Sequence, residues 1–203
     1  MQTVLWILII LIGYCLGNIN GAIIISKTMM KDDVRSHGSG NAGLTNFFRT
    51  YGGFQSLLVI LIDVLKCVIA CVIAARLVPE QVVLAKMVAG IATILGHSYP
   101  AVAGFRGGKG ILCGAALGGC LDWRVLVLIL GVFIITIALT RYVSLGSVLA
   151  ATTFAITFNI FYWGSWLSCI LAVLAAVFVI YRHRGNIARL VKGTESKLSF
   201  RKK

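Results

Sequence analysis

The sequence has 203 residues, of which 59% are hydrophobic and only 12% are charged, and its mean hydropathy is +0.96. Soluble domains are about half apolar and about a quarter charged, so these values exclude a soluble enzyme, a disordered chain and a solvated binding module. Apolar runs of about 15 to 25 residues recur from end to end, which is typical of a polytopic helical membrane protein. The formal net charge of +13 must therefore be concentrated in the loops.

Seven apolar segments are expected to form a bundle of transmembrane helices in a single all-α domain over residues 1–203. In chain order they are residues 4–25, 54–78, 82–99, 111–121, 125–139, 143–162 and 166–181. The fourth segment is short, because a helix of about 11 residues rises only about 16 Å, roughly half of a hydrocarbon core. We therefore expect either a helix that begins earlier, at the glycines of residues 107–110, or a bilayer that is thinned there.

Positive charges predict the orientation of these spans. With the C-terminus inside, 15 of the 19 Lys and Arg residues fall on the inner face, including the terminal Arg201, Lys202 and Lys203. The positive-inside rule therefore favours an N-out, C-in arrangement. The polar stretches 26–53, 97–110 and 182–203 then share the cytoplasmic side, where they can meet, whereas the outer loops are too short to form a site.

The first polar motif, residues 37–49, has the composition of a phosphate-binding loop. Its closely spaced glycines let the backbone approach a ligand, and their N–H groups can form an anion nest. Arg49 follows Thr45 by four residues, so the two share a face if a helix has begun. Such a site needs many donors, one fixed cation and little bulk. A plain Gly/Ser turn is the alternative. The glycines and neutral donors are Gly38, Gly40, Gly43, Ser39, Asn41, Thr45 and Asn46.

The second motif, residues 96–110, places glycines around Lys109 just ahead of an expected helix start, where backbone N–H groups favour anions. It does not match a nucleotide-binding P-loop, because Ala103 and Gly110 occupy the positions that require Gly and Ser or Thr. A positively charged inner loop is the alternative. His97, at the start of this motif, is either a helix-end cap or a base.

The third motif, residues 181–195, contains Arg182, His183 and Asn186. Ile187 and Leu190 predict a short amphipathic helix at the membrane interface. Alone, this segment is also typical of a basic tail attracted to anionic lipid. Stacking aromatic residues and a nucleic-acid module are both missing, so a nucleic-acid partner is not expected.

Ionisable groups are rare within the spans. Asp63 and Lys66 lie three residues apart on the second span, and such groups usually pair in the bundle interior. The two residues either form an ion pair that fixes the packing of the helices, or they orient the cationic residues of the proposed site. The six cysteines are interpreted as small buried hydrophobes, and no metal-ligand constellation is present in the sequence. With only six Asp and Glu residues, paired carboxylates for acid–base work are nearly excluded.

The chain resembles the bacterial acyl-phosphate:glycerol-3-phosphate acyltransferases, the PlsY family, over nearly its whole length. The resemblance rests on the motifs within residues 38–49, 96–110 and 182–195, and on segments 63–66 and 142–147. It implies a multi-pass enzyme of the bacterial cytoplasmic membrane whose site faces the cytosol. An acyl phosphate would acylate the sn-1 hydroxyl of glycerol 3-phosphate, giving lysophosphatidate and phosphate, without a cofactor or metal. The expected partners are these two substrates and the lipid bilayer, and we expect a monomer.

The resemblance also implies roles for individual residues. The first motif would hold the acyl phosphate, while Arg49, Lys109, Ser147, His183 and Asn186 would hold glycerol 3-phosphate and the reacting groups. The expected catalytic residues are Ser39, Arg49, Lys109, His183 and Asn186. The expected substrate-binding residues are Gly40, Asn41, Gly43, Thr45, Asn46, His97, Gly107, Gly108, Gly110, Ser147 and Arg182.

Two questions stay open at this point. In the first, either the phosphate of the substrate takes the hydroxyl proton, or His97 or His183 acts as general base, a role worth about 10²–10⁴ in rate. In the second, a transporter or flippase of a phosphorylated small molecule would also account for cationic glycine loops beside membrane spans. The sequence contains no clear internal repeat and no polar gate on its outer face, which favours the enzyme.

Overall fold

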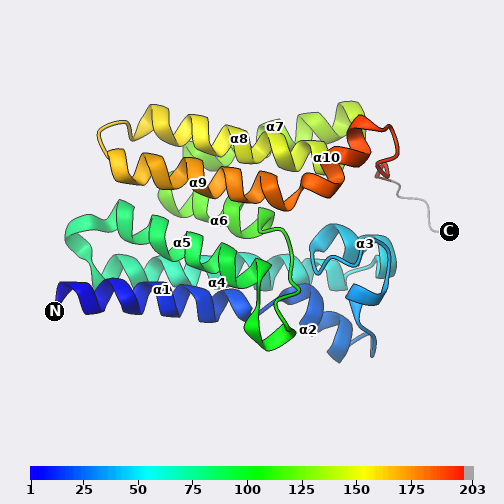
Figure 1. Ribbon diagram of the computed structural model, residues 1–203, viewed down its shortest axis with the longest axis horizontal. Coiled ribbons are helices and arrows are strands. Elements are labelled where there is room, and N and C mark those ends of the chain that lie inside the picture. The colour runs from blue at the N-terminus through cyan, green and yellow to red at the C-terminus, as the bar shows by residue number, and fades with distance from the viewer. Residues whose placement is uncertain (199–203) are drawn as a thin grey trace. The chain divides into compact units, whose positions relative to one another are not determined.

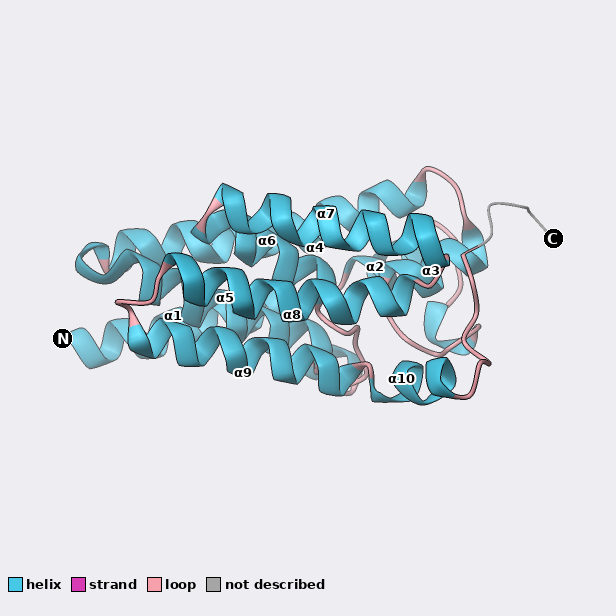
Figure 2. Ribbon diagram, turned by 90° about the horizontal axis from the view of Figure 1, so that it is seen from above, coloured by secondary structure: helices cyan, strands magenta, loops and turns pink. Residues whose placement is uncertain are grey.

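The computed structural model describes residues 1–198, which form helices and loops with no strand in that range (Figure 2). The chain divides into two compact units, Met1–Leu121 and Asp122–Lys203. The expected all-helical bundle is therefore confirmed. A single functional domain over residues 1–203 stays a prediction.

The first unit contains four long or medium helices that pack along one another and two short ones (Figure 1). Helix α5 packs against α1, α4 and α6, and α4 also packs against α1, α2 and α6. Three 3₁₀ turns, η1 (Val34–Ser36), η2 (Pro79–Gln81) and η3 (Ala101–Ala103), lie in the connections. The helices are α1 (Gln2–Asn18), α2 (Gly21–Thr28), α3 (Leu44–Tyr51), α4 (Gln55–Leu77), α5 (Val82–Ser98) and α6 (Ile111–Leu121).

Small residues let α1 and α5 approach closely. A Cβ atom added at Gly17 would meet the backbone of Thr93 and Gly96, and one added at Gly96 would meet the carbonyl of Tyr14. Gly13, one turn before Gly17, lies against Ala89 in the same way. Between apolar helices there is little hydrophobic driving force in a membrane, so such close backbone contact is what holds them together.

The first apolar segment, predicted as a span over residues 4–25, lies within the single candidate span Gln2–Thr28, but its helix is broken. Helix α1 ends at Asn18 and α2 begins at Gly21, with Ile19 and Asn20 in extended conformations. Asn20 caps the new helix, since its Oδ1 accepts a hydrogen bond from the N–H of Ile23 at 3.0 Å. Hydropathy alone could not reveal the break, because apolar residues continue on both sides of it.

The second unit is built from three apolar helices and a short one. Helix α8 (Val143–Phe161) packs against both α7 (Trp123–Thr140) and α9 (Trp166–Arg182). The chain bends by 59° after α9 into α10 (Arg184–Val191), which packs on α8 and α9. The short helix expected from Ile187 and Leu190 is thus confirmed.

Within residues 1–198, length and hydropathy single out five helical stretches that are able to cross a membrane, or six if the bent pair α9–α10 is one span. Helix α6 is the short apolar segment that the sequence indicated, and it begins at Ile111. The glycines of residues 107–110 therefore precede the helix. The count of seven spans stays a prediction.

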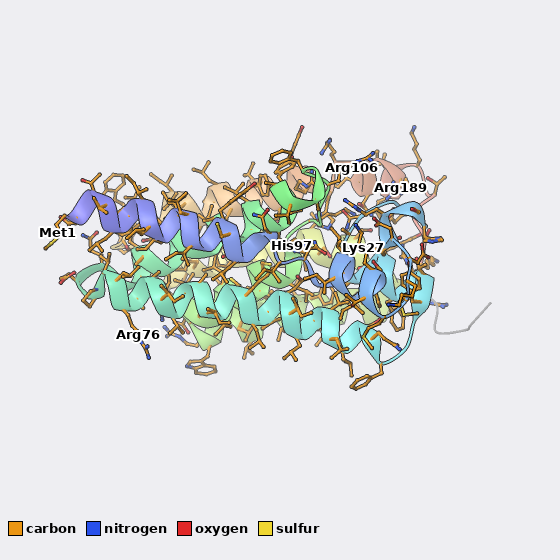
Figure 3. The ribbon with its side chains drawn as sticks, turned by 90° about the horizontal axis from the view of Figure 1, so that it is seen from below. Met1, Lys27, Arg76, His97, Arg106 and Arg189 are labelled. Carbon is orange, nitrogen blue, oxygen red and sulfur yellow. The ribbon has the colours of Figure 1, made fainter. Side chains whose placement is uncertain are left out.

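Charge is distributed unevenly along the first unit. Figure 3 shows Lys27 and Arg106 toward the end of the bundle that lies opposite Met1 and Arg76. This distribution agrees with the one used to predict an N-out, C-in orientation, which itself stays a prediction. Arg201, Lys202 and Lys203, which the sequence assigns to the inner face, lie outside the described residues.

Replacing Gly17 with Ala should destabilise the protein by about 1–3 kcal/mol, because the new Cβ has no room between α1 and α5. Gly114→Ala in α6 is the matched control, since an added Cβ there meets nothing within 4 Å. Thermal unfolding in detergent measures both variants. Equal unfolding midpoints for the two variants would contradict the close packing of α1 on α5.

Candidate active site

Asn46 gives the first motif its shape. Its side chain is only 5% exposed, and its Nδ2 donates to the carbonyls of Val34 and His37, each at 3.0 Å. Its Oδ1 accepts from the N–H of Ser39 at 3.0 Å. Gly38, with φ of +55°, lies so close to this oxygen that a Cβ would collide with it. The side-chain amide of Asn46 is thus hydrogen-bonded within the loop and fixes the conformation of its backbone.

The groups that the loop presents outward are those of an anion site. Ser39 and Gly40 are exposed, while Asn41, Gly43 and Thr45 are partly buried. Helix α3 begins at Leu44, so Arg49 lies one turn beyond Thr45 on the same face, as the sequence suggested. Arg49 is exposed. Backbone donors, hydroxyls and a guanidinium are therefore available within a single short segment.

The second motif folds back on the end of α5. The N–H of Gly108 donates to the carbonyl of His97 at 3.0 Å, and the N–H of Gly107 donates to that of Ser98 at 3.2 Å. Gly107, Gly108 and Gly110 are buried, whereas Lys109 between them is half-buried. A Cβ at Gly108 would collide with the ring of His97. The glycines thus permit close packing and leave Lys109 just before the start of α6.

The structure brings the first two motifs together. Nη1 of Arg35 donates to the carbonyl of Ala103 at 2.8 Å, and Nδ2 of Asn20 donates to that of Ala42 at 3.1 Å. Arg35 is itself fixed by Asp33, whose carboxylate it contacts at 2.8 Å. The hydrogen bond from Arg35 is the main reason that the pKa of Asp33 falls to about 2. The carboxylate is therefore ionised at any physiological pH and keeps Arg35 in place.

A buried polar cluster lies beneath both loops. Lys66 and Asp63 form the ion pair that their spacing suggested, with Nζ and Oδ1 2.7 Å apart. Nζ of Lys66 also lies 2.8 Å from Nδ1 of His97. The imidazole is only 4% exposed. The pair therefore fixes packing and reaches a residue of the second motif at the same time.

The third motif is organised by Glu195. Its Oε1 accepts from Nδ2 of Asn186, and its Oε2 accepts from Nε of Arg189, both at 2.7 Å. Burial opposes ionisation of this carboxyl, but polar interactions with Asn186, Ser144 and Arg189 together with the charge of Arg189 outweigh it and hold the pKa of Glu195 below its usual value. Glu195 thus fixes the side chain of Asn186 as an ionised clamp.

The other expected residues of the second unit lie at the same turn or on the neighbouring α8. His183 is 3% exposed, and its Nδ1 lies 2.8 Å from the carbonyl of Val179. Ser147 is buried on α8, where its hydroxyl donates to the carbonyl of Val143 at 2.9 Å. Arg182 is half-buried.

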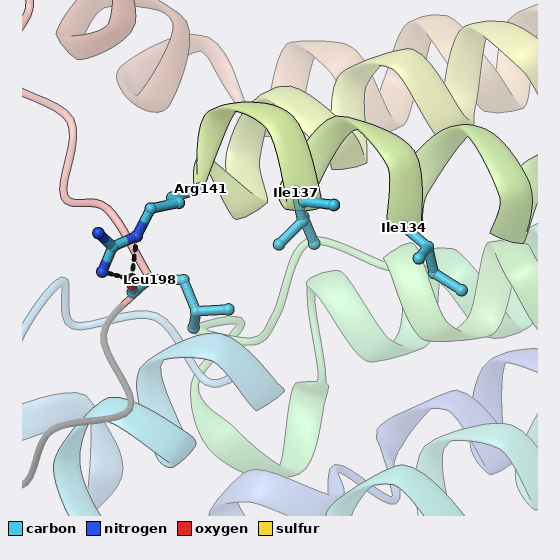
Figure 4. A pocket seen from close by; sticks show the side chains of 5 residues that line it. Ile134, Ile137, Arg141 and Leu198 are labelled. Atoms are coloured by element: carbon cyan, nitrogen blue, oxygen red, sulfur yellow. Dashed lines mark hydrogen bonds between the residues drawn. The ribbon is translucent and has the colours of Figure 1, made fainter.

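A shallow apolar pocket of about 360 Å³ lies elsewhere in the second unit, between the end of α7 and the tail. Figure 4 shows Ile134 and Ile137 along its wall and Arg141 reaching the tail, where Nη2 donates to the carbonyl of Leu198 at 3.1 Å. None of the expected site residues lines this pocket. We therefore assign it no part in the reaction.

Sequence reasoning assigned no site role to four residues that organise these loops. Asn20 was expected to pack helices near the inner end of its span, close to the proposed site, and a polar residue inside an apolar run is also the signal of a helix cap. Arg35 and Asp33 form an Asp-x-Arg pair that could have been noticed. Glu195 was part of the third motif, but its spacing from Asn186 does not reveal the clamp.

Comparison with known proteins identifies the family. A family model described as glycerol-3-phosphate acyltransferase matches residues 7–193. This chain belongs to the glycerol-3-phosphate acyltransferase family. A relative with that name from Clostridioides difficile (strain 630) is 41% identical, with both chains covered completely. Another, from Thermoanaerobacter pseudethanolicus, is 40% identical over 95% of each chain.

Solved structures agree with this assignment. The crystal structure of PlsY (YgiH), an integral membrane glycerol 3-phosphate acyltransferase, in its glycerol 3-phosphate form, matches with a TM-score of 0.88. That match has 30% sequence identity and covers 96% of each chain. The lysophosphatidic acid form matches with a TM-score of 0.84 at 29% identity, over 96% of this chain and 95% of the other. The resemblance to the PlsY family and the integral membrane fold are therefore both confirmed.

Replacing Glu195 with Gln should lower kcat/KM by about 10²-fold, because the uncharged amide cannot accept from both Asn186 and Arg189, and small displacements of Asn186, an expected catalytic residue, are costly. Glu80→Gln is the matched control, since Glu80 is exposed in η2. Steady-state kinetics of both purified variants measure the effect. A Glu195→Gln enzyme as active as the control would contradict the clamp.

Proposed function

We propose that this protein transfers the acyl chain of an acyl phosphate to the sn-1 hydroxyl of glycerol 3-phosphate, giving 1-acylglycerol 3-phosphate and inorganic phosphate. This is the first step of glycerophospholipid synthesis in a bacterial cytoplasmic membrane, with the site on the cytosolic side. The acyl chain lies in the bilayer while the phosphate groups are held at the interface. The enzyme works as a monomer without a metal or cofactor.

The observation that carries this proposal is the joining of two glycine loops, each with a cation, within one unit. Nη1 of Arg35, just before the first loop, donates to the carbonyl of Ala103 in the second motif at 2.8 Å. Nδ2 of Asn20 donates to the carbonyl of Ala42 in the first loop at 3.1 Å and lies 3.4 Å from Nδ1 of His97 in the second motif. Both substrates are anions, and they repel each other as they approach. Oriented N–H groups together with Arg49 and Lys109 oppose that repulsion and stabilise the charge that develops in the transition state.

Each expected residue other than His97 then receives a role. The backbone at Gly40 and Gly43, with Ser39, Asn41 and Thr45, binds the acyl phosphate, and Asn46 holds that loop in shape. Lys109 and Arg49 bind glycerol 3-phosphate, and Gly107, Gly108 and Gly110 allow Lys109 its position. From the second unit we assign the same substrates to Ser147, Arg182, His183 and Asn186.

An acyl phosphate is a mixed anhydride, so its leaving group is already good and no covalent enzyme intermediate is needed. The sn-1 oxygen attacks the carbonyl carbon, and the bond from that carbon to the phosphate oxygen breaks. The electron pair of that bond leaves with the phosphate. The hydroxyl proton passes to the same phosphate, so that hydrogen phosphate is released and atoms and charge balance.

The hydrogen bonds of the two candidate histidines indicate which group can accept the hydroxyl proton. Nδ1 of His97 lies 2.8 Å from the ammonium of Lys66, so the lone pair of this nitrogen is already engaged as a hydrogen-bond acceptor. Nδ1 of His183 faces the carbonyl of Val179 and therefore carries a hydrogen, so the lone pair of its neutral ring is on Nε2. His183 is thus the stronger competitor of the substrate phosphate as general base.

Purified protein in detergent should release phosphate from an acyl phosphate only when glycerol 3-phosphate is present. Arg49→Ala should lower this rate by about 10²–10³-fold, because the charge repulsion between the two substrates is then less well opposed. Arg76→Ala, an arginine at the other end of the first unit (Figure 3), is the control and should keep the wild-type rate. Protein that binds or moves glycerol 3-phosphate without releasing phosphate would indicate a transporter instead.

The pH dependence separates the two proton acceptors. If the substrate phosphate takes the proton, His97→Ala and His183→Ala lower the rate but leave its pH profile unchanged near the ordinary histidine pKa of about 6.5. Turnover of both variants across that range tests this expectation. Loss of about 10²–10⁴ in rate together with a vanished limb of the profile in His183→Ala would show that this histidine is the base.

A further inference from the structure

The break between α1 and α2 lies inside an apolar stretch, where unpaired backbone groups are costly. Lys66 supplies donors to the end of α1, with Nζ 2.8 Å from the carbonyl of Ile19 and 3.3 Å from that of Gly17. Asp63 supplies an acceptor to the start of α2, where its Oδ1 accepts from the N–H of Gly21 at 3.2 Å. The cation thus meets the negative end of one helix and the anion meets the positive end of the next.

Asn20, in the middle of this break, has a fixed amide orientation. Its Oδ1 accepts from the N–H of Ile23, and its Nδ2 donates to the carbonyl of Ala42. Exchanging the two atoms would place oxygen against oxygen and nitrogen against an N–H donor. The group that lies 3.4 Å from Nδ1 of His97 is therefore the donor Nδ2.

Two donors consequently converge on one ring nitrogen of His97. The ammonium of Lys66 lies 2.8 Å from Nδ1 and can only donate, and the amide nitrogen of Asn20 approaches the same atom. Nδ1 must then be the acceptor, which places the ring proton on Nε2. The ionisable groups that face the ring are Lys66 and Asp63 of α4, and the latter lies 3.4 Å from Nδ1.

The opposite edge of the ring faces the second loop. A Cβ built on Gly108 would collide with Nε2 of His97 and would also crowd the carbonyl of Ala42. The imidazole therefore lies between the first loop, which Asn20 holds through Ala42, and the second loop. A single side chain of defined tautomer connects the two proposed phosphate-binding segments.

We propose that Lys66 and Asn20 hold His97 as its Nε2–H tautomer, and that His97 in this state is a positioning residue that sets the two anion-binding loops against each other. The kinetic part of this proposal rests on the proposed acyl transfer, whereas the tautomer does not. The cluster formed by Asn20, Asp63, Lys66 and His97 is called the joint below.

Nitrogen NMR of protein labelled with ¹⁵N-histidine tests the tautomer directly. The chain has 3 histidines, and the signals that disappear in His97→Asn assign those of His97. We expect an unprotonated Nδ1 and a protonated Nε2 at neutral pH. A protonated Nδ1 would overturn the proposal, whether or not the protein shows any acyl transfer.

The double variant Asp63→Asn with Lys66→Met tests the role of the Lys66 ammonium as donor to His97. Both charges of the pair are removed together, so neither is left buried without its partner. With Lys66 gone, Nδ1 of His97 loses its nearer donor, and the ring should become a mixture of tautomers. Lys86→Met is the matched control, because Lys86 is also within a span and donates to the carbonyl of Cys120 at 2.7 Å, away from His97. An unchanged tautomer in the double variant would overturn the role of Lys66.

A pair of variants with similar side-chain shape tests the positioning role. Asn at position 97 can still accept from Lys66, whereas Leu cannot, so the hydrogen bond that joins Lys66 of α4 to α5 is lost. We expect His97→Leu to lose about 10²-fold in kcat/KM, as misplaced substrates do, and His97→Asn to lose clearly less. Equal losses in the two variants would overturn the proposal. A wild-type enzyme that releases no phosphate would instead reject the proposed function and leave the tautomer standing.

Discussion

The break between α1 and α2 is the constraint on which the first unit depends. It leaves carbonyl and N–H groups among apolar helices, where each must find a partner. Lys66 and Asp63 provide those partners on α4, and Asn20 caps the second helix. Because the same ammonium also reaches His97 on α5, one buried ion pair fixes three helices at the depth from which both loops emerge. Breaking a buried pair of this kind by removing one partner costs about 3–5 kcal/mol.

A rigid support beneath the loops suits the chemistry that the loops are proposed to carry out. An acyl phosphate needs little activation, so the protein contributes mainly by holding two anions at reacting distance. Such holding requires donors that do not move when charge develops. The amide of Asn46 fixes the first loop, Arg35 ties it to the second, and the joint supports both from beneath. In the other unit, Glu195 gives Asn186 the same kind of support.

Much of this organisation could be predicted from the sequence. The apolar segments and the short helix at Ile111 follow from hydropathy and length. The glycines and donors of residues 37–49 predict a phosphate-binding loop, and this stays a prediction. The different roles of Asn41 and Asn46 within the loop could not be predicted. Both are asparagines of the same motif, and only their contacts in the folded structure distinguish them. The joint could not be predicted either, since it links Asn20 to a histidine 77 positions away. Local patterns carry no information about such distant contacts.

The central claim is that one buried joint holds both loops. Hydrogen–deuterium exchange of the backbone amides in residues 37–43 and 104–110 tests it most directly, in wild type and in the Asp63→Asn, Lys66→Met variant. If the joint supports both loops, their amides exchange faster together in the variant, while α7 to α9 keep their protection. Loops that stay as protected as in the wild type, or only one loop that loosens, would contradict the account.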